Sequence, residues 1–345
     1  MRHSPLLDTI ENQRFGCELA GSPAYARVLS AVGRDVANTG ACARILGPYE
    51  AAPFGDAVLL RLLAGVHQIV LEGRGSDLAA HYPSAGGRPG RGIEAAFLAV
   101  VAREEPELVE AMKRGVQTNE VGRSAALLCG YLEVADRGLP MRILEVGASA
   151  GLNLWFDRYR YEAGGTAFGP AGSPLRFDEP FFGPPPDLNR PIDIVERRGS
   201  DLDPIDPTTE AGRLRLRSLI WPDQPERRAR LDAALEAVGN EAPVVERADA
   251  VAWLQELLAR PVSGVVTLVV HSIVFQYLSP TARREFLAVI DAAGSRATLD
   301  APLAWLRMEP GGDQAEIRLT TWPDGGSRLL ARSSFHGPPV VPTRR

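Results

Sequence analysis

Short apolar runs rich in β-branched residues follow one another through the second part of the chain, separated by longer amphipathic stretches. Such runs occur at residues 142–146, 192–196, 244–247, 264–271 and 298–307. Strands that alternate with helical stretches are typical of a parallel sheet with crossover helices. Two further runs, 315–321 and 328–334, flank the turn-forming sequence Trp322-Pro323-Asp324-Gly325-Gly326. The pattern therefore predicts an α/β fold whose mostly parallel sheet ends in an antiparallel hairpin.

The first part of the chain has a different periodicity. Apolar residues recur there at spacings of three and four, as in Val58, Leu59, Leu62, Leu63 and Val66, which is the period of a helix with one buried face. The segment 73–90 is rich in glycine and proline and interrupts this pattern, either as a lid or as a plain connection. We therefore expect two domains, a helical cap over residues 1–139 and an α/β domain over residues 140–345.

The composition restricts the partners of the protein. A formal net charge of −5 provides no general attraction for the phosphates of nucleic acids. No apolar run reaches the roughly 18 residues of a membrane span, and the first residues lack an apolar signal core. Cys17, Cys42 and Cys129 are widely spaced and odd in number, which fits neither a disulfide framework nor a metal site. We expect a cytoplasmic protein that acts on a small molecule, without a metal and without nucleic-acid or membrane partners.

A glycine turn follows the first predicted strand. Its sequence is Glu145-Val146-Gly147-Ala148-Ser149-Ala150-Gly151, and a helical stretch beginning Leu152-Asn153-Leu154 comes next. A strand, a tight glycine turn and a helix together let the backbone approach a nucleotide-like ligand closely, and free amides at a helix N-terminus favour polar or anionic groups. The candidate ligand contacts are Glu145, Gly147, Ser149, Gly151 and Asn153.

Two other interpretations of this turn stay open. Its sequence also matches the Gly-x-Ser-x-Gly motif, which forms the nucleophile elbow of serine hydrolases. In that case Ser149 would attack a carbonyl carbon after activation by His271 or His336, the two histidines that follow it. Alternatively, the glycines serve tight packing alone.

Polar residues also follow the second and third predicted strands. In a doubly wound sheet the ligand lies at the carboxyl ends of the strands, so these residues are candidate contacts. Glu196, or alternatively Asp201, is placed to bind ribose hydroxyls, unless it pairs with Arg197 or Arg198. Asp249 is placed to accept a hydrogen bond from the amino group of adenine, to cap the next helix, or both.

The fourth predicted strand delivers His271 and Ser272 to the same edge. His271 is the candidate general base, because histidine has an ordinary pKa near 6.5. The alternative is a histidine hydrogen-bonded to neighbouring backbone at a strand end. Ser272 is a candidate cofactor contact, and Tyr277 either lines the pocket or packs.

Three polar residues begin the helix before the first predicted strand. They are Asn119, Glu120 and Arg123. We expect them to bind a carboxylate of the cofactor or of the substrate, with a solvated helix N-terminus as the alternative.

Several motifs carry a resemblance to known families. They are residues 117–123 (QTNEVGR), 145–154 (EVGASAGLNL), 157–161 (DRYRY) and 322–326 (WPDGG). Together they resemble a bacterial family of domains of unknown function, family 2332, over nearly the whole chain. The glycine turn, Asp249-Ala250 and the sequence from His271 to Leu278 resemble class I, Rossmann-like methyltransferases that depend on S-adenosyl-L-methionine.

The second resemblance implies a Rossmann-like fold, S-adenosyl-L-methionine as cofactor and methyl transfer to a small molecule. Glu145 would then lie near the methionine end of the cofactor. The sequence departs from that pattern in two places, because Ala148-Ser149-Ala150 replaces the usual glycine spacing and an insertion at about residues 159–190 precedes the second strand. A noncatalytic ligand-binding protein on the same fold and a serine hydrolase using Ser149 are the alternatives.

Overall fold

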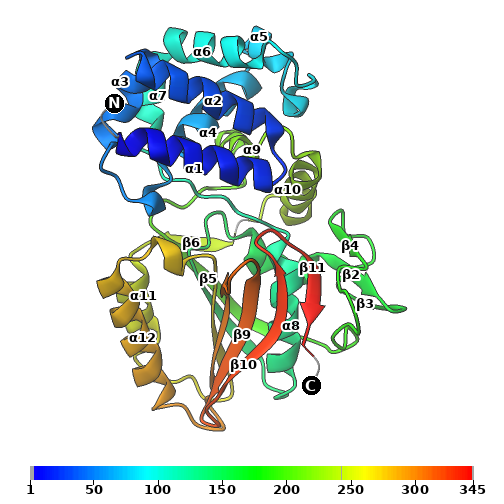
Figure 1. Cartoon of the computed structure of the whole chain (residues 1–345). Coiled ribbons are helices and arrows are strands. Elements are labelled where there is room, and N and C mark those ends of the chain that lie inside the picture. Colours follow the sequence, from blue (N-terminus) through cyan, green and yellow to red (C-terminus); the bar gives the residue numbers. More distant parts are fainter. Residues whose placement is uncertain (1–3, 242, 344–345) are drawn as a thin grey trace. The chain divides into compact units, whose positions relative to one another are not determined.

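The computed structural model describes residues 4–241 and 243–343. The chain forms two compact units (Figure 1). One contains the residues up to 118 together with 209–229, and the other contains 119–208 together with the chain from 230 onward. We refer to them as the helical unit and the sheet unit.

The helical unit is built from short helices around one apolar core. Its α-helices are α1 (Pro5–Leu19), α2 (Pro23–Ala37), α3 (Ala41–Leu46), α4 (Val58–Leu71), α5 (Ser76–Ala79), α6 (Ile93–Arg103), α7 (Glu105–Ala111) and α9 (Glu210–Ser218), with 3₁₀ turns at Gly47–Tyr49, Phe54–Asp56 and Pro83–Ala85. Proline in the first turn of α1 and α2 matches the fixed backbone angle that a helix start requires. The apolar stripe predicted on α4 is buried.

The segment 73–90 is an ordered part of the helical unit. It contains α5 and a 3₁₀ turn, and Tyr82 within it is fully buried in the core. A buried tyrosine of this size contributes a large apolar area to the core. The packing therefore ties this segment to the helices on either side of it.

The sheet unit contains an eight-stranded sheet. Its strands are β1 (Met141–Val146), β5 (Ile194–Asp201), β6 (Val244–Arg247), β7 (Val266–Ser272), β8 (Leu303–Pro310), β9 (Ala315–Trp322), β10 (Ser327–Ser334) and β11 (Gly337–Pro342). The strand order is β11-β10-β9-β8-β7-β1-β5-β6. The five strands from β8 to β6 are parallel, and β9, β10 and β11 extend the sheet as antiparallel strands. The predicted mixed α/β fold with a mostly parallel sheet and a terminal hairpin is confirmed.

Helices cover both faces of this sheet, which Figure 1 shows with α11 (Ala250–Leu257) and α12 (Pro280–Gly294) on one side and α8 (Arg123–Ala135) on the other. Leu144, Val146 and Val269 belong to the apolar cluster under α11 and α12. Successive side chains of a strand point to opposite faces. Glu145 and Ser272 therefore lie on the face that α8 covers.

The division of the chain corrects the expected boundary after residue 139. Helix α8 belongs to the sheet unit, because it packs against β8, β9, β10 and β11. A Cβ atom on Gly130 would come within 2.2 Å of Leu306 on β8, so the helix lies directly on the sheet. Residues 209–229 belong to the helical unit instead, where Trp221 packs on the core. Helix α10 (Pro225–Val238) runs across this division.

The second predicted strand was too short. It was expected over 192–196, whereas β5 continues to Asp201. Its later residues are charged, and their partners lie beside them: Arg197 pairs with Asp157 at 2.6 Å and Arg198 with Glu246 at 2.6 Å. An apolar pattern cannot detect a strand whose side chains are paired in this way.

Two strand regions were not predicted. Within the insertion at 159–190, β2 (Arg160–Ala163), β3 (Thr166–Phe168) and β4 (Arg176–Asp178) form a small sheet of their own. Aromatic stacking holds it, with the rings of Tyr161 and Phe177 5.0 Å apart. The last strand, β11, was missed because its prolines are unfavourable within a sheet. It is an edge strand, where proline is tolerated.

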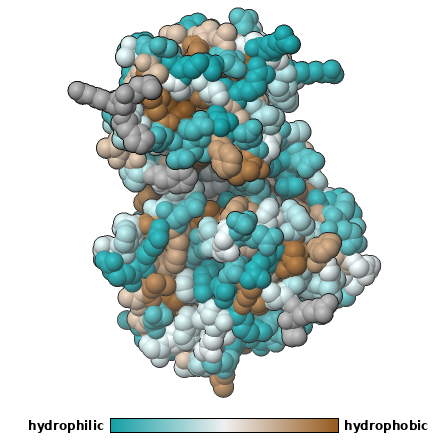
Figure 2. All heavy atoms as spheres, viewed as in Figure 1, coloured by the Kyte–Doolittle hydropathy of each residue, from teal (hydrophilic) through white to brown (hydrophobic). Residues whose placement is uncertain are grey.

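No helix in the described part of the chain is long and apolar enough to cross a membrane. On the face drawn in Figure 2, apolar residues form separate spots among hydrophilic ones. Cys17, Cys42 and Cys129 are all buried as free thiols.

His67 connects three parts of the helical unit. Its Nδ1 lies 3.0 Å from the carbonyl oxygen of Ser218 and its Nε2 lies 2.7 Å from the hydroxyl of Ser84. Burial lowers the pKa of His67 to about 4. The folded chain therefore takes up this proton later than the unfolded chain as the pH falls.

We expect His67 to make the helical unit sensitive to acid. Its contribution to stability is present above about pH 6.5 and is lost as the pH falls toward 4, because only the unfolded state is protonated in that window. Urea unfolding at pH 7 and pH 4.5 should show a smaller loss for His67→Gln than for the wild-type chain. His81→Gln is the control, and an equal loss in all three proteins would contradict the prediction.

Candidate functional site

The glycine turn lies at the carboxyl end of β1. Gly147, Ser149 and Gly151 have positive φ angles of 68°, 56° and 72°. The left-handed region is unusual for serine, so this backbone must be held by its surroundings. The amide of Ser149 donates to a carboxylate oxygen of Asp201 at 2.9 Å, and the amide of Ala148 donates to the carbonyl oxygen of Ser200 at 3.0 Å. The end of β5 therefore fixes the turn.

The two glycines of the turn meet protein side chains closely. A Cβ atom on Gly147 would lie 2.7 Å from Val274, and one on Gly151 would lie 2.5 Å from Pro243. Real Cβ atoms do not approach other atoms so closely. Packing and the positive φ angles are sufficient reasons for glycine at both positions.

The polar residues just before α8 hydrogen-bond to the two residues that follow the glycine turn. The side-chain oxygen of Asn119 accepts a hydrogen bond from the amide of Leu152 at 2.9 Å. The side-chain amide of Asn153 donates to the carbonyl oxygen of Glu120 at 3.4 Å. Asn119, Glu120 and Asn153 are all buried, at 3–5% exposure, so these are interior contacts and not a solvated helix N-terminus.

Glu145 is a buried acid on the α8 face of the sheet. It is 2% exposed, and its Oε2 atom has no hydrogen-bond partner among the described residues. Burial raises the pKa of Glu145 to about 8, with Asp201 raising it further and the positive charge of Arg123 lowering it. A buried carboxyl oxygen without a partner is costly and requires an explanation.

Arg123 joins three elements next to Glu145. Its Nη1 donates to the carbonyl oxygen of Ser272 at 3.0 Å and lies 3.4 Å from the Ser272 hydroxyl. Its Nε donates to the carbonyl oxygen of Phe335 at 3.0 Å. The start of α8, the end of β7 and the β10–β11 turn therefore meet at one guanidinium group.

Glu120 and His336 form a second contact between the start of α8 and the β10–β11 turn. The Glu120 carboxylate lies 3.3 Å from Nδ1 of His336 and accepts a hydrogen bond from the amide of Gly122. This pairing was not predicted, because the two residues are more than two hundred positions apart. A Cβ atom on Gly122 would lie 2.2 Å from the carbonyl oxygen of His336, so the close approach needs glycine.

Asp201, and not Glu196, lies beside the glycine turn. Glu196 pairs with Arg142 at 2.8 Å, near the opposite end of the parallel strands. Asp201 ends β5, is 6% exposed and accepts the amides of Ser149 and Asp203, each at 2.9 Å. The preference for Glu196 was wrong, because β5 is longer than its apolar run.

Asp249 caps α11. One of its carboxylate oxygens accepts the amides of Val251 and Ala252, at 3.0 and 3.1 Å. The capping role expected from the sequence is confirmed. The further role toward an adenine ring stays a prediction.

His271 lies on the other face of the sheet and is fully buried. Its ring stacks on Phe275 at 4.6 Å, and its Nδ1 lies 2.7 Å from a carboxylate oxygen of Glu309. This enclosure, on the face opposite Glu145 and Ser272, contradicts its assignment as a general base in the ligand crevice. The partner of its ring is the Glu309 side chain and not the neighbouring backbone that the alternative expected. Tyr277 is 55% exposed and follows the same strand in a 3₁₀ turn (Phe275–Tyr277).

The structure thus brings together most of the predicted site residues. The cluster consists of Asn119, Glu120, Arg123, Glu145, Gly147, Ser149, Gly151, Asn153, Asp201 and Ser272. The two histidines of the hydrolase alternative each have a carboxylate partner, Glu309 for His271 and Glu120 for His336. The cluster has the components of a polar ligand site at a strand edge.

One family model matches almost the entire chain, over residues 8–341. It describes an uncharacterized protein conserved in bacteria (DUF2332). The chain belongs to the DUF2332 family. The resemblance to this family that the motifs indicated is confirmed, and the matched region of this DUF2332 protein includes both units. No curated protein and no solved structure matches it.

Proposed function

We propose that this DUF2332 protein binds S-adenosyl-L-methionine at the carboxyl edge of β1 and transfers its methyl group to a small molecule. The observation that carries the proposal is the strand order around β1. Strands β5 and β6 follow on one side of β1, and β7 and β8 follow on the other. Ligands of doubly wound sheets bind where the strand order reverses, outside the carboxyl ends of the strands. The glycine turn and Glu145 lie at that point.

The residues around the reversal suit a ligand that has an ammonium group, a carboxylate and a ribose. Glu145 has a buried oxygen without a partner among the described residues, which an ammonium group would satisfy. Arg123 supplies the positive charge next to it for a carboxylate. Asp201 ends β5 at the same edge, and a carboxylate is a group that accepts hydrogen bonds from ribose hydroxyls.

The ligand supplies a methyl group on a sulfonium centre, and the protein needs to position the acceptor in line with it. Rate acceleration by orientation and exclusion of water requires few dedicated side chains. The enclosure of His271 removes the expected general base from this chemistry. That enclosure also favours the second candidate, a protein that binds the same ligand without turnover.

We expect calorimetric titration of the full chain to show saturable binding of S-adenosyl-L-methionine and of S-adenosylhomocysteine. Glu145→Gln should weaken both by about tenfold or more, because it removes the carboxyl group that would ionise and pair with the ammonium group of the ligand. Glu285→Gln is the matched control, since Glu285 is exposed on α12. Circular dichroism melting checks that each variant is folded.

The outcomes separate the candidate functions. If neither ligand binds to the folded wild-type chain, the proposal is wrong for both enzyme and binding protein. Binding together with methyl transfer to any of a broad panel of small acceptors supports the enzyme. A fluorophosphonate that labels Ser149 without ligand binding supports the hydrolase alternative.

A further inference from the structure

The turn that follows β7 contacts the candidate ligand site on both sides of Ile273. Before Ile273, the carbonyl oxygen and the hydroxyl of Ser272 lie 3.0 and 3.4 Å from Nη1 of Arg123. After Ile273, the side chain of Val274 lies only 2.7 Å from the place that a Cβ atom on Gly147 would occupy. The position of this turn therefore determines where both contacts of the site form.

Ile273 has a backbone conformation that its own side chain disfavours. Its φ angle is 55°, in the left-handed region, where a β-branched residue is a rare exception. Such strain persists only where the surrounding structure holds it, and it is concentrated at binding and catalytic sites. One such contact is made by the amide of Ile273, which donates to the carbonyl oxygen of Met308 on β8 at 2.8 Å.

The second contact that holds the turn comes from Glu309, the next residue of β8. Its Oε1 accepts hydrogen bonds from the amide of Val274 at 2.8 Å and from the amide of Phe275 at 3.3 Å. The same oxygen lies 2.7 Å from Nδ1 of His271. Groups from both sides of Ile273 therefore converge on one carboxylate oxygen.

The charge of Glu309 suits these partners. Burial by itself raises the pKa of Glu309, but the contacts with His271 and with the two amides lower it below the ordinary value of a glutamate. Hydrogen bonds to an ionised acceptor are stronger than those to a neutral one. The ring of His271 stacks on Phe275 at 4.6 Å and lies 5.6 and 5.8 Å from the rings of Phe286 and Trp305. Glu309 thus has a partner that aromatic packing holds in place.

We infer that Glu309 is a positioning residue of the candidate ligand site. From the opposite face of the sheet, its carboxylate holds residues 272–274 in the conformation that forms the site, without contacting the ligand. The inference rests on the function proposed above for that site. It assigns the enclosed His271, through its contact with Glu309, to the support of this turn and not to proton transfer.

The test combines two measurements on the full chain. Glu309→Leu removes the acceptor oxygen, and calorimetric titration should then show binding of S-adenosylhomocysteine weakened about tenfold. Without ligand, the amides of Val274 and Phe275 should exchange with deuterated water about tenfold faster, as measured by nuclear magnetic resonance. Glu309→Gln keeps an uncharged acceptor oxygen, so both effects should shrink to about threefold.

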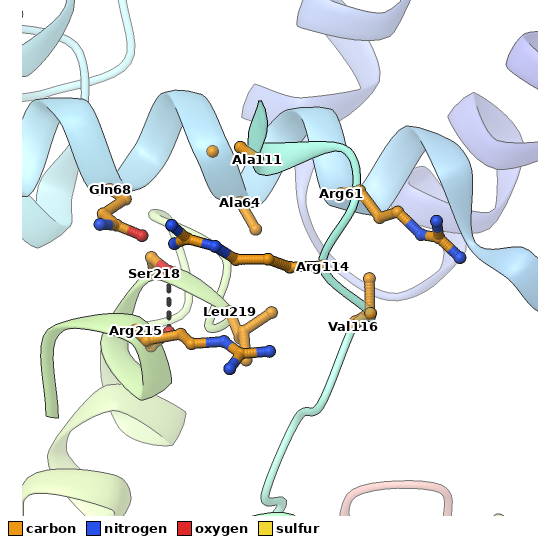
Figure 3. Close-up of a pocket in the computed structure, with 11 residues that line it drawn as sticks. Arg61, Ala64, Gln68, Ala111, Arg114, Val116, Arg215, Ser218 and Leu219 are labelled. Carbon is orange, nitrogen blue, oxygen red and sulfur yellow. Dashed lines mark hydrogen bonds between the residues drawn. The ribbon is translucent and has the colours of Figure 1, made fainter. Parts of the chain in front are cut away.

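Two control variants separate positioning from general destabilisation. Glu316→Gln changes the carboxylate directly opposite Glu309 on β9, which pairs with Arg318 at 2.8 Å. Arg114→Gln changes the helical unit, where Arg114 lines a pocket between α4 and the end of α9 (Figure 3). Both variants should match the wild-type chain in ligand affinity and in exchange of the two amides. Urea unfolding measures the global stability of each variant.

Weaker binding and faster exchange in Glu309→Leu, with recovery in Glu309→Gln, support the inference. Unchanged exchange or unchanged affinity in a folded Glu309→Leu overturns it, and so does an equal loss in Glu316→Gln. If Glu309→Leu does not fold, exchange in Glu309→Gln decides, and wild-type rates at both amides then overturn the inference. If the wild-type chain binds no S-adenosylhomocysteine, the proposed function is wrong, and exchange alone decides whether Glu309 holds the turn.

Discussion

Replacing Gly337 by alanine should destabilise the sheet unit by about 3 kcal/mol or more. Gly337 begins β11 with a φ angle of 99°, and a Cβ atom there would lie 2.1 Å from the carbonyl oxygen of Gly122. The new methyl group would therefore meet backbone atoms, which cannot rotate away as a flexible side chain can. Urea unfolding followed by circular dichroism measures the loss.

Gly312→Ala is the matched control for this substitution. Gly312 has a similar φ angle of 94°, but nothing lies within 4 Å of a Cβ atom there. It should lose only the backbone strain, about 1–2 kcal/mol. Equal losses in the two variants would show that the contact with Gly122 relaxes at little cost, contrary to the prediction.

Gly337→Ala should also disturb the candidate site. Gly122 directly precedes Arg123, and Arg123 donates to the carbonyl oxygens of Ser272 and Phe335. A displacement at Gly337 moves both the start of α8 and the turn that carries Phe335. We therefore expect Gly337→Ala to weaken any ligand bound next to Arg123, whereas Gly312→Ala should not.

The contribution of Glu145 to the free energy of unfolding should fall as the pH rises from about 5 to 8. Burial raises the pKa of its carboxyl to about 8, far above the value of an exposed glutamate. Between these two values the unfolded chain has lost this proton and the folded chain retains it. Folding then binds a proton, so raising the pH favours the unfolded state.

Glu145→Gln isolates this effect. Its unfolding free energy should decline less with pH than that of the wild-type chain, by on the order of 1 kcal/mol per pH unit between pH 5 and 8. Denaturant unfolding at three pH values in this window provides the comparison, with Glu285→Gln expected to follow the wild-type chain. Parallel pH profiles for wild type and Glu145→Gln would mean that Glu145 ionises normally in the folded protein.

The raised pKa of Glu145 predicts that binding of a ligand with an ammonium group releases a proton. Binding next to Glu145 would stabilise the ionised carboxylate and release its proton at neutral pH. Calorimetric titration in buffers of different ionisation enthalpy detects such a release. The signal should be absent in Glu145→Gln.

The sequence by itself determined the fold class and the position of the glycine turn. Short runs rich in β-branched residues and bounded by turn signals favour strands, and a glycine turn after such a run restricts the backbone locally. The capping role of Asp249 is likewise local, because its two amide partners lie two and three residues away. These features depend on neighbours in the chain, which a pattern can detect.

Only the tertiary structure decided which polar residues meet. Glu196 and Asp201 are both acidic residues of one segment, and the sequence alone does not distinguish their positions in the sheet. Because β5 continues to Asp201, Glu196 lies near the amino ends of the parallel strands and Asp201 lies at their carboxyl ends. The strand pleat placed His271 and Ser272 on opposite faces, so that one is enclosed by aromatic rings and the other contacts Arg123. Such contacts join residues far apart in the chain, and burial and pairing energies, which no local pattern contains, determine them.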